Sequence, residues 1–147
     1  MKKRIVISIG SALLAATALC ACTKSTTATV KVKNAEVPTL YSVLDEERKL
    51  TGQGTSVENG TSTKTLTYGN GDVTQDDAIN YINALAENED FTVVDGSEDE
   101  NDSSNEIKVG AAKDMGEGKI VVVSADWTMS ETTIEYAYGE GTITPNE

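Results

Sequence analysis

Residues 119–127 read KIVVVSADW, the most apolar stretch beyond the first 21 residues of the chain. Four consecutive β-branched residues run from Ile120 to Val123, and such residues favour strands. Because successive side chains of a strand point to opposite faces of the sheet, this run places apolar groups on both faces. We therefore expect an interior strand here, with Trp127 at its end as a core or sheet-end residue rather than a ligand platform.

The stretches on either side of this strand supply its neighbours. Ile107–Lys113 precedes it across a glycine-containing turn, and Thr132–Tyr138 follows it after a second turn. Apolar residues alternate with polar ones in the latter stretch, which is typical of a strand with one buried face. Tyr136 and Tyr138 share a face, and we expect that face to cover the core rather than to present an aromatic strip to a partner.

A β-hairpin is predicted further upstream, over residues 48–68. Asn59 and Gly60 tolerate the positive φ angles of a tight hairpin turn. The flanking residues are rich in threonine, so one face of this hairpin should be solvated. Gly52 and Gly54 indicate a bulge or a weak position in its first strand.

One helix is predicted, from Thr74 to about Glu87. Thr74 can cap the first free N–H groups, and acids follow it in the first turn, where the helix dipole favours them. The apolar residues that recur at helical spacing are Ala78, Ile79, Ile82, Leu85 and Ala86. This stripe should pack on the sheet, with Tyr81 and Asn83 nearer to solvent.

A further strand is expected at residues 91–94. The predicted order is thus strand, strand, helix and four more strands. One helix can cover one face of an antiparallel sheet, so the expected fold is α+β, a small two-layer domain over residues 39–147.

The first 21 residues have the pattern of a secretory signal peptide. Lys2, Lys3 and Arg4 precede an apolar run from Ile5 to Ala21. Such a charged start, short apolar middle and small residues at the end are typical of an export signal. The run is also at the lower length limit for a permanent membrane-spanning helix.

Residues 19–22 read Leu19-Cys20-Ala21-Cys22. This stretch resembles the lipobox of bacterial lipoproteins, which has an aliphatic residue, two small residues and an obligatory cysteine. Cys20 departs from the commonest pattern, which has alanine or serine there. The resemblance implies a diacylglyceryl group on Cys22 and cleavage after Ala21, and two acyl chains give stable anchoring. The alternative is an ordinary cleaved signal with a coincidental cysteine.

Residues 22–38 would then carry the lipid and form a tether. Their threonine, lysine and alanine content is typical of a flexible coil with a reach of about 20–25 Å. Alternation of Val30 and Val32 leaves a first edge strand open as an alternative.

Composition excludes several classes of function. The chain has 24 acidic and 12 basic residues, and loss of the three N-terminal bases takes the net charge from −12 to −15. Such a surface repels nucleic acid, and its simplest purpose is solubility. The chain has no histidine, which excludes Ser-His-Asp and Cys-His catalysis and histidine-based metal sites.

An acidic stretch, DGSEDENDSSN at 95–105, is the one candidate for metal binding. Its spacing partly matches a calcium loop, but Glu100 occupies the position that needs glycine, and strands rather than helices should flank it. Its weak calcium candidates are Asp95, Asp99, Asp102 and Glu106.

These features together predict a non-catalytic, lipid-anchored extracytoplasmic protein of a bacterial membrane. It would act by binding, with a possible protein partner in the envelope, or as an envelope component, and it would need no cofactor. A small carboxylate-dependent hydrolase and a calcium-responsive adhesion or sensor module are the alternatives.

Overall fold

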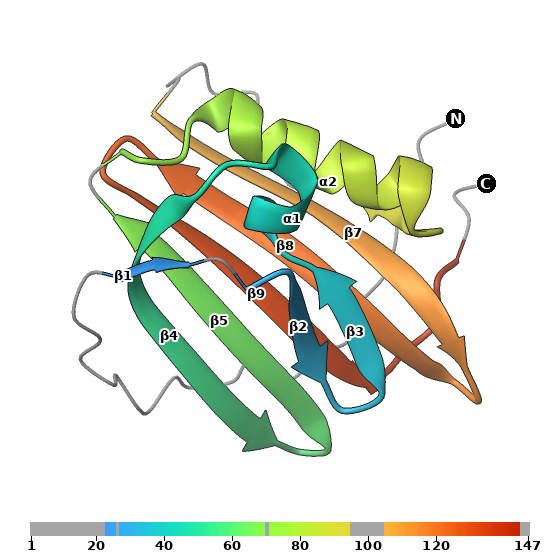
Figure 1. Cartoon of the computed structure of the whole chain (residues 1–147). Coiled ribbons are helices and arrows are strands. Elements are labelled where there is room, and N and C mark those ends of the chain that lie inside the picture. The colour runs from blue at the N-terminus through green and yellow to red at the C-terminus, as the bar shows by residue number, and fades with distance from the viewer. Residues whose placement is uncertain (1–22, 26, 70, 95–104, 145–147) are drawn as a thin grey trace.

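The computed structural model describes residues 23–25, 27–69, 71–94 and 105–144. Nine strands and two helices form within these ranges (Figure 1). In chain order they are β1 (Thr23–Ser25), β2 (Thr29–Val32), β3 (Ala35–Pro38), α1 (Leu40–Leu44), β4 (Arg48–Glu58), β5 (Thr61–Gly69), α2 (Gln75–Asn88), β6 (Thr92–Val94), β7 (Glu106–Gly116), β8 (Lys119–Thr128) and β9 (Glu131–Glu140).

Seven of the strands form one sheet in the order β1-β4-β5-β9-β8-β7-β6, and every neighbouring pair is antiparallel. The long helix α2 lies across one face of this sheet, over β7 and β8 (Figure 1). The prediction of a mainly antiparallel sheet with a helix packed on it is therefore confirmed.

The apolar stretch at 119–127 is an interior strand, as its composition predicts. β8 lies between β9 and β7, and its side chains are buried on both faces. Val121 and Val123 enter the main core, while Ile120 and Val122 form a second apolar cluster with Ala112 on the other face. Burial on both faces explains why this strand lacks the polar alternation of its neighbours.

The predicted order of elements is wrong at the N-terminal side. β1, β2, β3 and α1 precede the hairpin. The coil predicted up to residue 38 is wrong, and the alternative of a strand at Val30 and Val32 is confirmed. The cause is a short apolar alternation across the β2–β3 turn. Four of its side chains turn into the main core: Val30, Val32, Ala35 and Val37. The small β2–β3 sheet contacts β5 and β9, so it covers the part of the large sheet that α2 does not reach (Figure 1).

The buried face of α2 differs from the predicted one. Ala78, Ile82 and Leu85 are buried as expected, but so is Tyr81, and Ile79 is only half-buried. The prediction that Tyr81 lies near solvent is wrong. Its ring is apolar and its hydroxyl donates to the Pro38 carbonyl, so the phenol is buried without losing a hydrogen bond.

The hairpin at 48–68 and its turn are confirmed. β4 and β5 pair along their length. In the turn that connects them, Asn59 has a φ angle of 48° and Gly60 one of 83°. The register shifts between Leu50 and Gly52, where the two glycines of this strand begin. The prediction of a bulge or a weak position in this strand is confirmed.

Candidate functional site

The residues singled out from the sequence lie mostly outside the described ranges. Cys22, Asp95, Asp99 and Asp102 all fall there. Glu106 is the exposed first residue of β7. In the described part of the chain, no three side chains from His, Cys, Asp and Glu come together in a way that could hold a metal ion.

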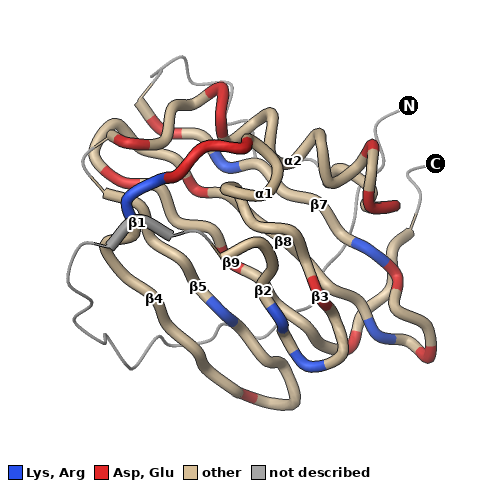
Figure 2. Tube along the Cα trace, viewed as in Figure 1, with Lys and Arg blue, Asp and Glu red and all other residues tan. Residues whose placement is uncertain are grey.

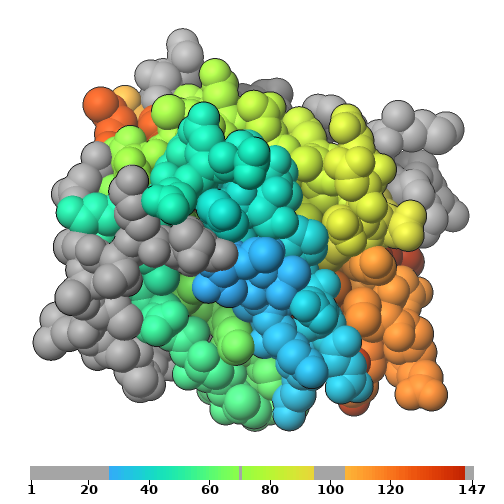
Figure 3. Space-filling view, viewed as in Figure 1, coloured from blue at the N-terminus to red at the C-terminus, as the bar shows by residue number. Residues whose placement is uncertain are grey.

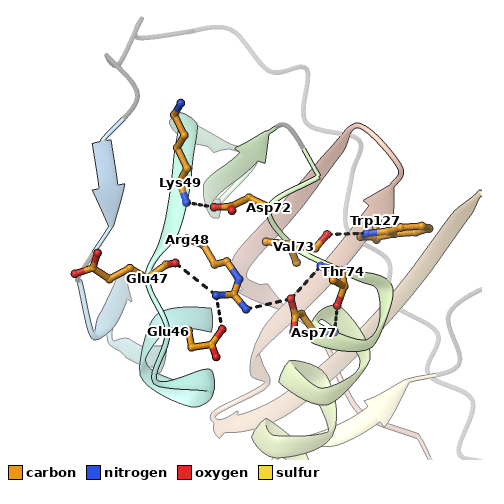
Figure 4. Close-up of polar contacts among 9 residues, drawn as sticks. All are labelled: Glu46, Glu47, Arg48, Lys49, Asp72, Val73, Thr74, Asp77 and Trp127. Carbon is orange, nitrogen blue, oxygen red and sulfur yellow. Dashed lines mark hydrogen bonds and ion pairs between the residues drawn. The ribbon is translucent and has the colours of Figure 1, made fainter.

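A polar cluster joins the start of β4 to the start of α2 (Figure 4). The Arg48 guanidinium lies 2.7 Å from the Glu46 carboxylate and 3.3 Å from that of Asp77. Asp77 also accepts a hydrogen bond from the Thr74 amide, while its own amide donates to the Thr74 hydroxyl, which completes a capping box. One carboxylate therefore fixes both the helix start and the arginine.

This cluster holds a corner of the fold together rather than forming a reactive centre. Burial lowers the pKa of Arg48, but hydrogen bonds to Glu46 and Asp77 outweigh burial and raise it above its ordinary value. Nearby, Trp127 donates from its ring nitrogen to the Val73 carbonyl at 2.9 Å (Figure 4). Trp127 is thus a sheet-end residue packed against the core, as predicted.

Three tyrosines are buried where α2, β3 and the sheet meet: Tyr68, Tyr81 and Tyr136. The Tyr81 hydroxyl donates to the Pro38 carbonyl at 2.7 Å and lies 3.1 Å from the Tyr136 hydroxyl. A carbonyl can only accept a hydrogen bond, so the Tyr81 hydroxyl donates its one hydrogen to Pro38. The Tyr136 hydroxyl therefore donates to the Tyr81 oxygen. Tyr136 is in the core, as its alternation predicts.

Burial keeps these hydroxyls protonated. It raises the pKa of Tyr68 to about 12 and raises the pKa values of Tyr81 and Tyr136 further above their ordinary range. A general base or nucleophile needs a pKa close to the working pH and access to its substrate. These phenols have neither property, so we assign them to the stability of the fold.

A hollow lies between β2 and the β4–β5 hairpin. Its volume is about 500 Å³, and its lining comes from three stretches, 27–31, 50–55 and 64–66. In Figure 3 the blue surface of β2 and the green surface of β4 and β5 adjoin there. We call this hollow the β2–β4 groove.

The wall of the groove nearest the N-terminus is fixed by Thr39. The Thr39 hydroxyl donates to the Thr27 carbonyl at 2.6 Å and accepts from the Ser42 amide at the start of α1, and the Thr39 amide donates to the Ala28 carbonyl. Thr39 is itself 1% exposed. A buried threonine thus ties the stretch before β2 to a helix, which gives the groove a defined shape.

The lining of the groove is positively charged. Lys31 of β2 and Lys64 of β5 both line it, and none of the other described residues that line it is an aspartate or glutamate. In Figure 2 the basic positions on β2 and β5 lie in the lower half, whereas much of the acidic charge lies above them, in the stretch after α1 and along α2. This is the reverse of the whole chain, in which acids outnumber bases two to one.

Ser62 precedes Lys64 by two residues on the same face of β5, and a serine beside a lysine base is a known type of nucleophile. Ser62 is only 6% exposed, its hydroxyl has no hydrogen-bond partner among the described residues, and it does not line the groove. A substrate in the groove would not contact this hydroxyl. The geometry therefore gives Ser62 no catalytic role.

No family model, curated protein or solved structure matches this chain. Within the described ranges no helix combines the length and the apolarity needed to span a membrane. Sequence patterns did not identify the groove, because its walls come from three separate strands. The nearest signal was the alternation of Val30 and Val32, which places Lys31 on the opposite face of β2.

Proposed function

We propose that this chain is a lipid-anchored binding protein on the outer side of a bacterial membrane, and that it is not an enzyme. Its fold would be a small two-layer α+β domain, with α1, α2 and the β2–β3 hairpin as one layer on the large sheet. The proposal rests on the sequence Leu19-Cys20-Ala21-Cys22 after an apolar run.

The position of β1 alters the geometry of this proposal. β1 begins at Thr23, directly after Cys22, and Thr23 pairs with Leu50 of β4. A lipid on Cys22 would therefore hold this edge of the sheet next to the membrane, without the 20–25 Å spacing of a flexible tether. Leu50 also lines the β2–β4 groove, so the groove would open close to the membrane surface.

A binding role is supported by the form of the groove. Small-molecule sites are concave, have volumes of about 300–1,000 Å³ and combine an apolar lining with a few polar groups. The groove, at about 500 Å³, has Leu50 and Leu66 beside lysine and threonine side chains. The absence of histidine from the sequence removes the commonest general base and favours binding over catalysis.

The test compares two neighbouring cysteines. We expect Cys22→Ala to abolish lipid attachment and leave an uncleaved or unlipidated protein, because the thioether requires this thiol. Cys20→Ala is the matched control and should mature normally, since alanine is common at that position of a lipobox. Intact mass of the membrane fraction measures both. A wild-type N-terminus other than acylated Cys22 would refute the anchoring.

A further inference from the structure

We propose that the β2–β4 groove binds a small organic acid, with Lys31 and Lys64 as the groups that recognise its carboxylate. This inference names a ligand class for the binding role proposed above and rests on that role. It does not depend on the lipid anchor, which is tested separately through Cys22.

The first argument is the local reversal of charge. Among the described residues, Arg48, Lys108 and Lys119 form ion pairs with acids, but neither Lys31 nor Lys64 does so. Lys33 and Lys49 also lack an ion pair in the described part of the chain, but Lys31 and Lys64 are the two lysines among the described residues that line this hollow. In a chain with an excess of acids, two unpaired lysines at one site without a lining acid favour an anionic ligand.

The second argument concerns the rest of the ligand. Val30, Leu50 and Leu66 contribute apolar surface to the groove, so a bare inorganic anion would leave most of its volume unused. Lysines on two different strands suit separate charges on one molecule better than a single compact anion. A short dicarboxylate with a hydrocarbon middle matches both the charges and the apolar surface.

One carboxylate lies near the groove and would oppose such a ligand. Glu36 of β3 is the cross-strand neighbour of Lys31, and it accepts a hydrogen bond of 2.8 Å from the hydroxyl of Thr29, a lining residue. Replacing this charge should favour an anion in the groove. Glu36 therefore supplies a variant whose expected effect is opposite to that of the lysine variants.

The experiment titrates the purified full-length protein, in the detergent used to extract it, with three probes. Glutarate has two carboxylates, glutaramide is its neutral analogue, and inorganic phosphate is a compact anion. Calorimetry should detect glutarate binding that weakens as salt is added, because screening acts on exposed charges. Glutaramide should not bind. Phosphate binding as tight as glutarate binding would overturn the organic-acid assignment, and no binding of glutarate would overturn the proposal.

Four variants then locate the site. Lys31→Gln and Lys64→Gln should each weaken glutarate binding about tenfold, the usual effect of losing a hydrogen bond to a charged group. Glu36→Gln should tighten it. Lys108→Gln makes the same charge change on the opposite face of the sheet and should leave affinity unchanged. Equal weakening by Lys64→Gln and Lys108→Gln would show a nonspecific charge effect and refute the site. Unchanged thermal melting of each variant shows that it is folded.

Discussion

The two halves of the sheet bury their inner face in different ways. Under α2, strands β7 and β8 present alanine and valine side chains to a helix whose buried residues include Ile82 and Leu85. Under the β2–β3 hairpin, β4 and β5 present threonine, glutamine and lysine as well as leucine, and a groove remains open. Both halves are antiparallel and continuous through β9, so the difference lies chiefly in the side chains.

If the groove has the binding role proposed above, this difference separates stability from recognition within one small domain. A closely packed apolar layer stabilises the fold, because each buried methylene adds about 0.8 kcal/mol. An open, partly polar surface contributes less to stability, but its side chains remain available to a ligand. The tyrosine cluster connects the halves, since Tyr81 on α2 bonds to the end of β3 and contacts Tyr136 on β9.

The largest predicted effect is therefore in the half covered by α2. Ile82→Ala should lower the free energy of unfolding by about 2–5 kcal/mol, since Ile82 is 1% exposed and its removal leaves a cavity. Denaturant titration measures this change. Thr55→Ala, an exposed position of β4 beside the groove, should change stability by less than about 0.5 kcal/mol. Similar losses for the two variants would contradict the division into a stabilising half and a recognising half.

A smaller effect is expected where the halves meet. Tyr81→Phe removes a hydroxyl that bonds both Pro38 and Tyr136, so it should destabilise the fold by about 1–3 kcal/mol. Tyr136→Phe keeps the bond from Tyr81 to Pro38 and should lose only about 1 kcal/mol. Thermal and urea unfolding of the two variants, measured side by side, test the direction of proton donation. A greater loss for Tyr136→Phe would show that the Tyr81 hydroxyl donates to Tyr136 instead.

The sequence predicted those parts of the fold whose signals are local. Asn59-Gly60 identified the hairpin turn, Thr74 with Asp77 identified the helix start, and the run from Ile120 identified an interior strand. Each signal arises from a few adjacent residues and the conformations they favour. Local patterns were sufficient for the antiparallel sheet and its main helix.

Parts that depend on distant partners were not predicted. Tyr81 can be buried because the Pro38 carbonyl, 43 residues away, accepts a hydrogen bond from its hydroxyl. The sequence predicted coil for β3, to which Pro38 belongs. The apolar alternation from Val30 to Val37 is short and lies in a threonine-rich stretch, which is typical of a tether. Its burial depends on the distant strands β5 and β9, which β2 contacts. The β2–β4 groove combines three strands that no single stretch of sequence connects.

The smallest predicted effect concerns calcium, and it sharpens the same comparison. Eight acids lie between Glu87 and Asp102 in the sequence, with no lysine or arginine between Lys64 and Lys108. The acidic residues from Asp95 onward follow β6 and precede β7 in the sequence, and β6 is the edge strand of the half that α2 covers. A specific calcium site there would place recognition on the stabilising half and contradict the division.

We expect no such site. Flexible oxygen shells suit calcium, but the glycine required for a tight loop is replaced by Glu100. At physiological salt, repulsion between carboxylates in water is already screened over about 8 Å. A calcium ion that relieved this repulsion would therefore gain little binding free energy. Calcium should therefore bind in the millimolar range and raise the melting temperature no more than magnesium does, as calorimetry and thermal melts can show. Micromolar affinity, lost on Asp99→Asn but kept in Lys108→Gln, would contradict this expectation and assign the acidic stretch a sensor role.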